Sequence, residues 1–210
     1  MKTIDLNSWK RKEHFRHFSG LDDPYWSFTT ELDCYQTYQA AKKNGESFFL
    51  RYLHKSLLAV QKVEELRMRI KDDQVVCYEE IHASATVLRD DETFGCCFIE
   101  FFESFSDFAT NAKEKIKQTR AGSGMCLDND YLLNQIHYSS IPWFNFSSLT
   151  FARSLKPQDS VPKMTFGRLN KETWRLPLAM QVHHGLVDGL HVARFLEVFQ
   201  SLLNDTEVEL

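Results

Sequence analysis

Helical and strand-like segments follow one another along this chain without the regular strand–helix–strand alternation that builds a parallel sheet. Helical periodicity of apolar residues occurs in segments 33–43, 47–63, 106–118 and 190–203. The strand-like segments are 66–70, 75–78, 84–88, 93–102, 136–139, 144–151, 163–169 and 174–184. Because segment 93–102 is nearly all apolar, it predicts a strand in the middle of a sheet. This order predicts an α+β fold with a central mixed, mostly antiparallel β-sheet flanked by helices.

Length and composition predict one globular domain that spans residues 1–210. The chain has no internal repeat and no linker rich in Pro, Gly or Ser. Its formal net charge of −4 gives no electrostatic reason to expect nucleic acid, whose binders carry basic patches. No stretch approaches the roughly 18 apolar residues of a membrane helix, and the N-terminus lacks the apolar core of a secretion signal. We therefore expect a protein with neither nucleic acid nor membrane as a partner.

The cysteines indicate the compartment. The chain contains five of them, at positions Cys34, Cys77, Cys96, Cys97 and Cys126. Their number is odd and their spacing is not that of a zinc site, so free thiols in a reducing cytoplasm are expected.

The chemistry-bearing segment begins at the end of the strand-like segment 174–184. Alternation places five side chains on one face of this strand: Leu176, Leu178, Met180, Val182 and His184. His184 is therefore predicted to end the strand on its apolar side, and His183 to point the other way. A desolvated imidazole stays neutral near neutral pH and can act as a base. An isolated His-x-x-x-Asp pattern, here completed by Asp188, is short and more often belongs to a structural histidine.

A metal site is an alternative interpretation of the same segment. His184, Asp188 and His191 stand at i, i+4 and i+7, the spacing of three ligands on one helix face. Gly185 and Gly189 disfavour a helix here, and a metal hydrolase would lack a nearby catalytic glutamate. We therefore expect no metal, and keep a metal-dependent hydrolase as the competing hypothesis.

Three segments together resemble one enzyme family. They are residues 9–15 (WKRKEHF), 142–148 (PWFNFSS) and 183–192 (HHGLVDGLHV), and residues 66–73 and 92–94 follow the same order. The chain resembles the trimeric chloramphenicol acetyltransferases of the His-x-x-x-Asp-Gly type, over roughly residues 9–200. Dihydrolipoyl acyltransferases and peptide-synthetase condensation domains share the histidine motif. The other segments, the chain length and the absence of a lipoyl domain favour the smaller acetyltransferase.

The resemblance implies an acetyl-CoA-dependent O-acetyltransferase that acts on a hydroxyl of chloramphenicol or a similar small acceptor. His184 matches the general base, and the acceptor oxygen attacks the thioester directly, without an acetyl-enzyme. Ser148 matches the residue that stabilises the tetrahedral oxyanion, and Thr165 one that holds a water against the same intermediate. Asp188 matches a structural aspartate whose partner is an arginine at the place of Arg11. The family assembles as homotrimers with active sites at the subunit interfaces.

The substrate-binding positions are less regular. Phe94 matches a phenylalanine of the acceptor pocket, whereas Phe18 and Cys96 replace an expected tyrosine and alanine. Arg168 retains a cation that suits a coenzyme A phosphate, while Leu169 replaces an expected tyrosine. An acyltransferase for another hydroxyl acceptor or acyl donor is therefore an open alternative. A non-catalytic binding trimer is a further one, for which the sequence offers no support.

Overall fold

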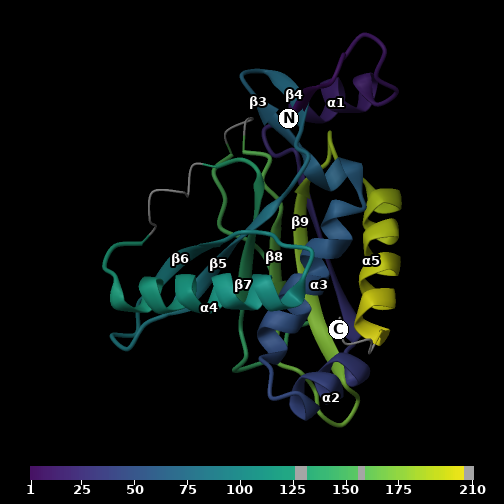
Figure 1. Cartoon of the computed structure of the whole chain (residues 1–210). Coiled ribbons are helices and arrows are strands. Elements are labelled where there is room, and N and C mark those ends of the chain that lie inside the picture. The colour runs from purple at the N-terminus through teal and green to yellow at the C-terminus, as the bar shows by residue number, and fades with distance from the viewer. Residues whose placement is uncertain (126–131, 156–158, 206–210) are drawn as a thin grey trace.

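A six-stranded mixed sheet forms the centre of the molecule (Figure 1). The computed structural model describes residues 1–125, 132–155 and 159–205. In sheet order the strands are β2 (Tyr25–Asp33), β9 (Arg175–His183), β8 (Lys163–Phe166), β7 (Gln135–Ser140), β5 (His82–Leu88) and β6 (Phe94–Ile99). Only the β5–β7 and β7–β8 pairs are parallel among these neighbours in the described chain. The predicted mixed, mostly antiparallel sheet is therefore confirmed.

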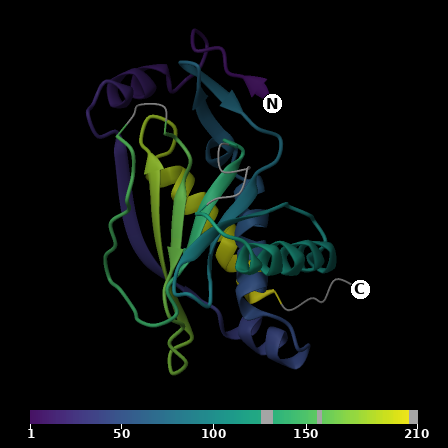
Figure 2. The same ribbon diagram turned by 90° about the vertical axis from the view of Figure 1, so that its left-hand side faces the viewer.

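Helices cover one face of this sheet, as Figures 1 and 2 show together. They are α2 (Tyr35–Lys43), α3 (Phe48–Gln61), α4 (Phe105–Ala121) and α5 (Gly189–Asn204). Buried Phe195, Phe199 and Leu203 recur every four residues on α5 and form its core-facing stripe. None of the helices in the described residues combines the length and apolar character that a membrane crossing requires.

A smaller sheet stands at one end of the molecule, near α1 (Lys12–Ser19) (Figure 1). It has the order β1-β4-β3, with β1 (Lys2–Thr3), β3 (Met68–Lys71) and β4 (Gln74–Cys77), and a 3₁₀ turn, η1 (Glu64–Arg67), precedes β3. Asp72 and Asp73 both have positive φ and form the tight turn that joins β3 to β4.

Three features of the strand prediction are wrong. Residues 144–151 form no strand and belong to neither sheet; the apolar residues Leu149 and Phe151 line a cavity instead. Strand β6 lies at an edge of the sheet, and its apolar residues are explained by packing on α4 on one face and a cavity on the other. The nine-residue strand β2 is missing from the prediction, because Ser27, Thr30 and Glu31 obscure its apolar alternation.

Candidate active site

His184 lies in the short loop between β9 and α5. Its backbone N–H donates to the carbonyl of Pro24 at 2.8 Å, and its ring stacks on Phe18 with ring centroids 4.0 Å apart. The Trp26 ring lies 5.5 Å away. Within the described residues His184 Nδ1 is buried without a hydrogen-bond partner. Aromatic packing against Phe18 and Trp26 therefore orients this imidazole.

The position of His184 differs from the prediction in one respect. Strand β9 ends one residue earlier, at His183, and it is His183 that is buried, whereas His184 is half-buried. Burial, followed by the charge of Arg153, lowers the pKa of His183 to about 4. His183 is thus a neutral core residue, and its Nδ1 accepts from the Gly185 backbone at 3.2 Å.

Arg11 and Asp188 form an ion pair beside this loop. Asp188 also accepts from the Leu190 backbone N–H at 3.0 Å and caps α5. A second Arg11 nitrogen donates to the His184 carbonyl at 3.4 Å. Burial raises the pKa of Asp188, but the hydrogen bond from Arg11 and the neighbouring positive charges outweigh it and leave the pKa below its usual value. The pair therefore fixes the backbone on which His184 stands.

His191 does not join His184 in a ligand set. Helix α5 begins at Gly189, so His184 lies outside it and the three ligand candidates do not share a helix face. His191 Nδ1 accepts from the Asp188 backbone at 3.0 Å, and its Nε2 lies 3.4 Å from Glu65. Among the described residues no group of three or more His, Cys, Asp or Glu is arranged to hold a metal ion. The structure thus contradicts the shared helix face on which the metal hypothesis was based.

A small cavity of about 450 Å³ gathers other predicted residues. Phe94 and Thr165 line it, together with Cys96 and Leu149, whereas His184 does not. Ser148 precedes Leu149 in an irregular, exposed segment. Thr165 of β8 pairs with Ala179 of β9. His184 follows Ala179 by five residues, so at the rise of an extended strand it lies about 16 Å further along the chain. A single chain thus brings Phe94 and Thr165 together and leaves His184, the base predicted from the sequence, apart from them.

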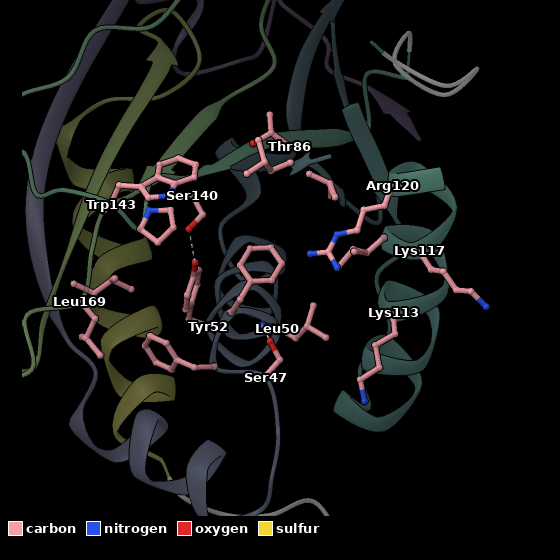
Figure 3. A pocket seen from close by; sticks show the side chains of 18 of the residues that line it. Ser47, Leu50, Tyr52, Thr86, Lys113, Lys117, Arg120, Ser140, Trp143 and Leu169 are labelled. Atoms are coloured by element: carbon pink, nitrogen blue, oxygen red, sulfur yellow. Dashed lines mark hydrogen bonds between the residues drawn. The ribbon is translucent and has the colours of Figure 1, made fainter. Parts of the chain in front are cut away.

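A large cavity of about 940 Å³ opens between α3, α4 and the sheet (Figure 3). Its apolar wall includes Phe48, Phe49, Leu50, Tyr52, Trp143 and Leu169. Tyr52 and Ser140 are hydrogen-bonded at 3.1 Å inside it, and Thr86 lines both this cavity and the small one. Exposed Arg168 stands beside the wall, where it donates to the Trp143 carbonyl at 3.4 Å.

Sequence reasoning missed two parts of this region. One is the buried Arg153, which donates to Gln181 at 2.6 Å, pairs with Asp159 and lies over the Tyr25 ring near His183. No local pattern identifies it, because Tyr25 belongs to the strand that was not predicted. The other is the wall of the large cavity on α4, with Lys113, Lys117 and Arg120. Their i, i+4, i+7 spacing is visible in the sequence, but a charged stripe of this kind is typical of ordinary solvated helix surface.

Comparison with known proteins places these features in a family. A family model described as chloramphenicol acetyltransferase matches residues 1–200. A chloramphenicol acetyltransferase of Campylobacter coli is 31% identical over 205 residues, covering 96% of this chain and 97% of the relative. One of Klebsiella sp. is 27% identical, with 97% and 94% covered.

Solved structures agree with the sequence comparison. A chloramphenicol acetyltransferase structure superposes with a TM-score of 0.89 at 28% identity, covering 96% of this chain and 99% of the other. A probable dihydrolipoamide acetyltransferase of Listeria monocytogenes, at 14% identity and a TM-score of 0.69, shares the fold. The chain therefore belongs to the chloramphenicol acetyltransferase family of acyltransferases.

Proposed function

We propose that this enzyme transfers the acetyl group of acetyl-CoA to a hydroxyl of chloramphenicol or a closely similar small acceptor. The observation that carries the proposal is the position of His184: its imidazole stacks on Phe18, and its backbone carbonyl accepts a hydrogen bond from Arg11 of the Arg11–Asp188 pair. The names of relatives that align over nearly the whole chain support the acceptor. The free thiols of Cys34, Cys77, Cys96 and Cys97 fit a reducing cytoplasm, and Cys126 lies outside the described residues.

The proposed reaction is a direct transfer without an acetyl-enzyme. His184 removes the proton of the acceptor hydroxyl, and the oxygen attacks the thioester carbonyl to give a tetrahedral oxyanion. The Ser148 hydroxyl donates to that oxyanion, and Thr165 holds a water against it. Collapse breaks the carbon–sulfur bond, and the proton on His184 passes to the departing thiolate. A donor aimed at an oxyanion contributes about 2.7–4 kcal/mol in other enzymes. The scheme needs no metal ion.

The two cavities suit two substrates. The small cavity, with Phe94 and Thr165, would take the acceptor, and the large apolar cavity would take the acyl-CoA. Thr86 borders both, so the acetyl group would lie where they meet. Arg168 donates to the carbonyl of Trp143, which lines the large cavity, and retains a charge that suits coenzyme A.

We further propose a homotrimer whose active sites lie between subunits. The support is that His184 lies apart from the cavity lined by Thr165 of the same chain. In a trimer, His184 of a neighbouring subunit could reach that cavity instead. Two exposed apolar side chains, Phe94 at the small cavity and Leu190 close to the His184 loop, would then be buried in the interface.

Mixed trimers test both proposals at once. His184→Ala removes the base and Ser148→Ala the oxyanion donor, and each variant alone should be nearly inactive. When equal amounts of the two variants assemble at random, about three quarters of the trimers contain both chains. If each site is shared between neighbours in a closed ring, each of these trimers has one intact site out of three. Co-refolding equal amounts should then restore about a quarter of the wild-type activity. No recovery in a verified mixed trimer would contradict a shared site, and wild-type protein that releases no thiol from acetyl-CoA with chloramphenicol would contradict the proposed acceptor.

Another hydroxyl acceptor is the second candidate, because Cys96 lines the small cavity and Phe18 stacks on His184 at positions where the family has other side chains. A thiol-release assay with a panel of hydroxyl compounds separates the two. Turnover of a panel compound at a higher kcat/KM than chloramphenicol would favour this candidate.

A further inference from the structure

We infer that Arg120 and Lys113 of α4, with Lys117 beside them, bind the phosphate groups of coenzyme A at the wall of the large cavity. The inference rests on the proposed function and deepens it. It moves the phosphate-binding role from Arg168, which lies outside the cavity wall, to a helix whose charged face looks like ordinary solvated surface.

The three cations lie on one stripe of the helix. Positions 113, 117 and 120 are four and three residues apart, which places them above one another on a single face. Figure 3 shows the Arg120 guanidinium turned into the cavity and the Lys113 side chain directed along its wall toward the Ser47 side. Lys117 lines the wall with its stem and turns its ammonium outward. Arg120 and Lys113 are therefore the two cations placed to meet a bound anion.

The wall of the large cavity is positively charged, whereas the chain as a whole is negatively charged. The cavity wall carries these three cations and one carboxylate, Asp90, although the chain has a formal net charge of −4. Within the described residues none of the three cations takes part in an ion pair or side-chain hydrogen bond. Arg89 and Arg51 contrast with them, because both are engaged by protein acceptors. Unpaired cations beside an apolar cavity favour an anionic ligand.

Coenzyme A has the shape and charge that such a cavity would select. Its pantetheine arm and acyl group are uncharged and suit the aromatic wall, and its phosphates lie toward the other end of the molecule. A cavity of about 940 Å³ is large enough for an extended ligand of this kind. The planar fork of Arg120 can donate two hydrogen bonds to one phosphate, whereas Lys113 acts as a point charge.

Binding measurements on the full-length protein test the inference. We would determine the Kd of coenzyme A and of 3′-dephospho-coenzyme A calorimetrically for wild type, for the single variant Arg120→Gln and for Lys113→Gln/Arg120→Gln. The matched control is Lys115→Gln, on the same helix but outside the cavity wall. The double variant should bind coenzyme A about 10- to 100-fold more weakly, with a shallower dependence on salt. The control should stay within about twofold of wild type.

A donor without phosphates separates failed binding from failed folding. With acetyl-pantetheine all variants should react at the wild-type rate, because this donor never meets the α4 cations. Wild-type affinity for coenzyme A in the double variant would overturn the inference and leave the proposed function standing. Equal losses in the double variant and in Lys115→Gln would also overturn it, since they would show a general charge effect. Wild-type protein that binds no coenzyme A would instead refute the proposed function.

Discussion

Arg11 and Asp188 lie 177 positions apart in the chain and form an ion pair that ties the start of α1 to the start of α5. The His184 carbonyl lies against the same guanidinium. The loop that carries His184 is therefore held at two points, and we expect a change in either partner to alter its geometry.

Asp188→Asn should lower both stability and activity. Asparagine can still cap α5, so this variant removes the charge and retains the cap. The side chains of Arg11 and Asp188 are 15% and 31% exposed, between the buried and exposed cases. We expect unfolding free energy to fall by about 1–3 kcal/mol in urea titrations. Asp188→Ala should lose roughly 1 kcal/mol more, because the cap is lost as well.

The exposed Arg16–Glu13 pair provides the control for this prediction. Arg16→Ala should change the free energy of unfolding by no more than about 0.5 kcal/mol. If Asp188→Asn were as stable and as active as wild type, the pair would have no positioning role.

His184→Ala should abolish acyl transfer and leave the fold intact. General base catalysis contributes about 10²–10⁴-fold, and we expect a loss of at least that order in kcat. The melting temperature and the oligomeric state should match those of the exposed-histidine variant His14→Ala, which should retain full activity. Turnover within about fivefold of wild type would refute the assignment of the base.

His183 should make the protein sensitive to acid. Its folded pKa of about 4 lies below its usual value of 6.5, so the unfolded chain binds this proton first as the pH falls. Above pH 6.5 the imidazole is neutral in both states, so burying it requires no deprotonation. As the pH falls from 6.5 toward 4, the unfolded chain gains this proton and the free energy of unfolding decreases. In urea titrations the stability difference between wild type and His183→Asn should narrow by about 2–3 kcal/mol between pH 7.5 and 4.5. A difference that stays constant would contradict the burial of a neutral imidazole.

Phe18 should affect catalysis through its contact with the base. Phe18→Leu removes the ring stacked on His184 and should lower kcat while the Kd of coenzyme A is unchanged. Phe18→Tyr keeps the ring and adds a hydroxyl, and should raise kcat/KM for chloramphenicol by about fivefold or more. Wild-type kinetics in both variants would show that this ring neither orients the imidazole nor meets the acceptor.

The sequence predicted those elements whose periodicity is local. Helices α3 and α5 and strand β9 were found close to their observed bounds, because their apolar residues repeat within one element. Local patterns could not predict the order of the strands in the sheet. Strand β6 is apolar like a central strand, because a helix covers one of its faces and a cavity lies at the other, but it lies at an edge of the sheet.

The candidate site divides in the same way. The His184 motif and its Arg11 partner could be predicted because a family resemblance linked distant segments. The environment of Arg153 and the large cavity could not, since both are made by residues that come together only in the folded chain.

Thr86, which belongs to the walls of both cavities and donates to the Ser139 hydroxyl at 3.3 Å, has an evolutionary consequence. With the two cavities assigned to the two substrates as proposed, any substitution at Thr86 that admits a bulkier acceptor also reshapes the cavity for the acyl donor. Adaptation at this position is therefore pleiotropic. New antibiotic specificities should arise first at positions such as Phe94 and Cys96, which line the small cavity alone, and Thr86 should change late or together with a compensating residue.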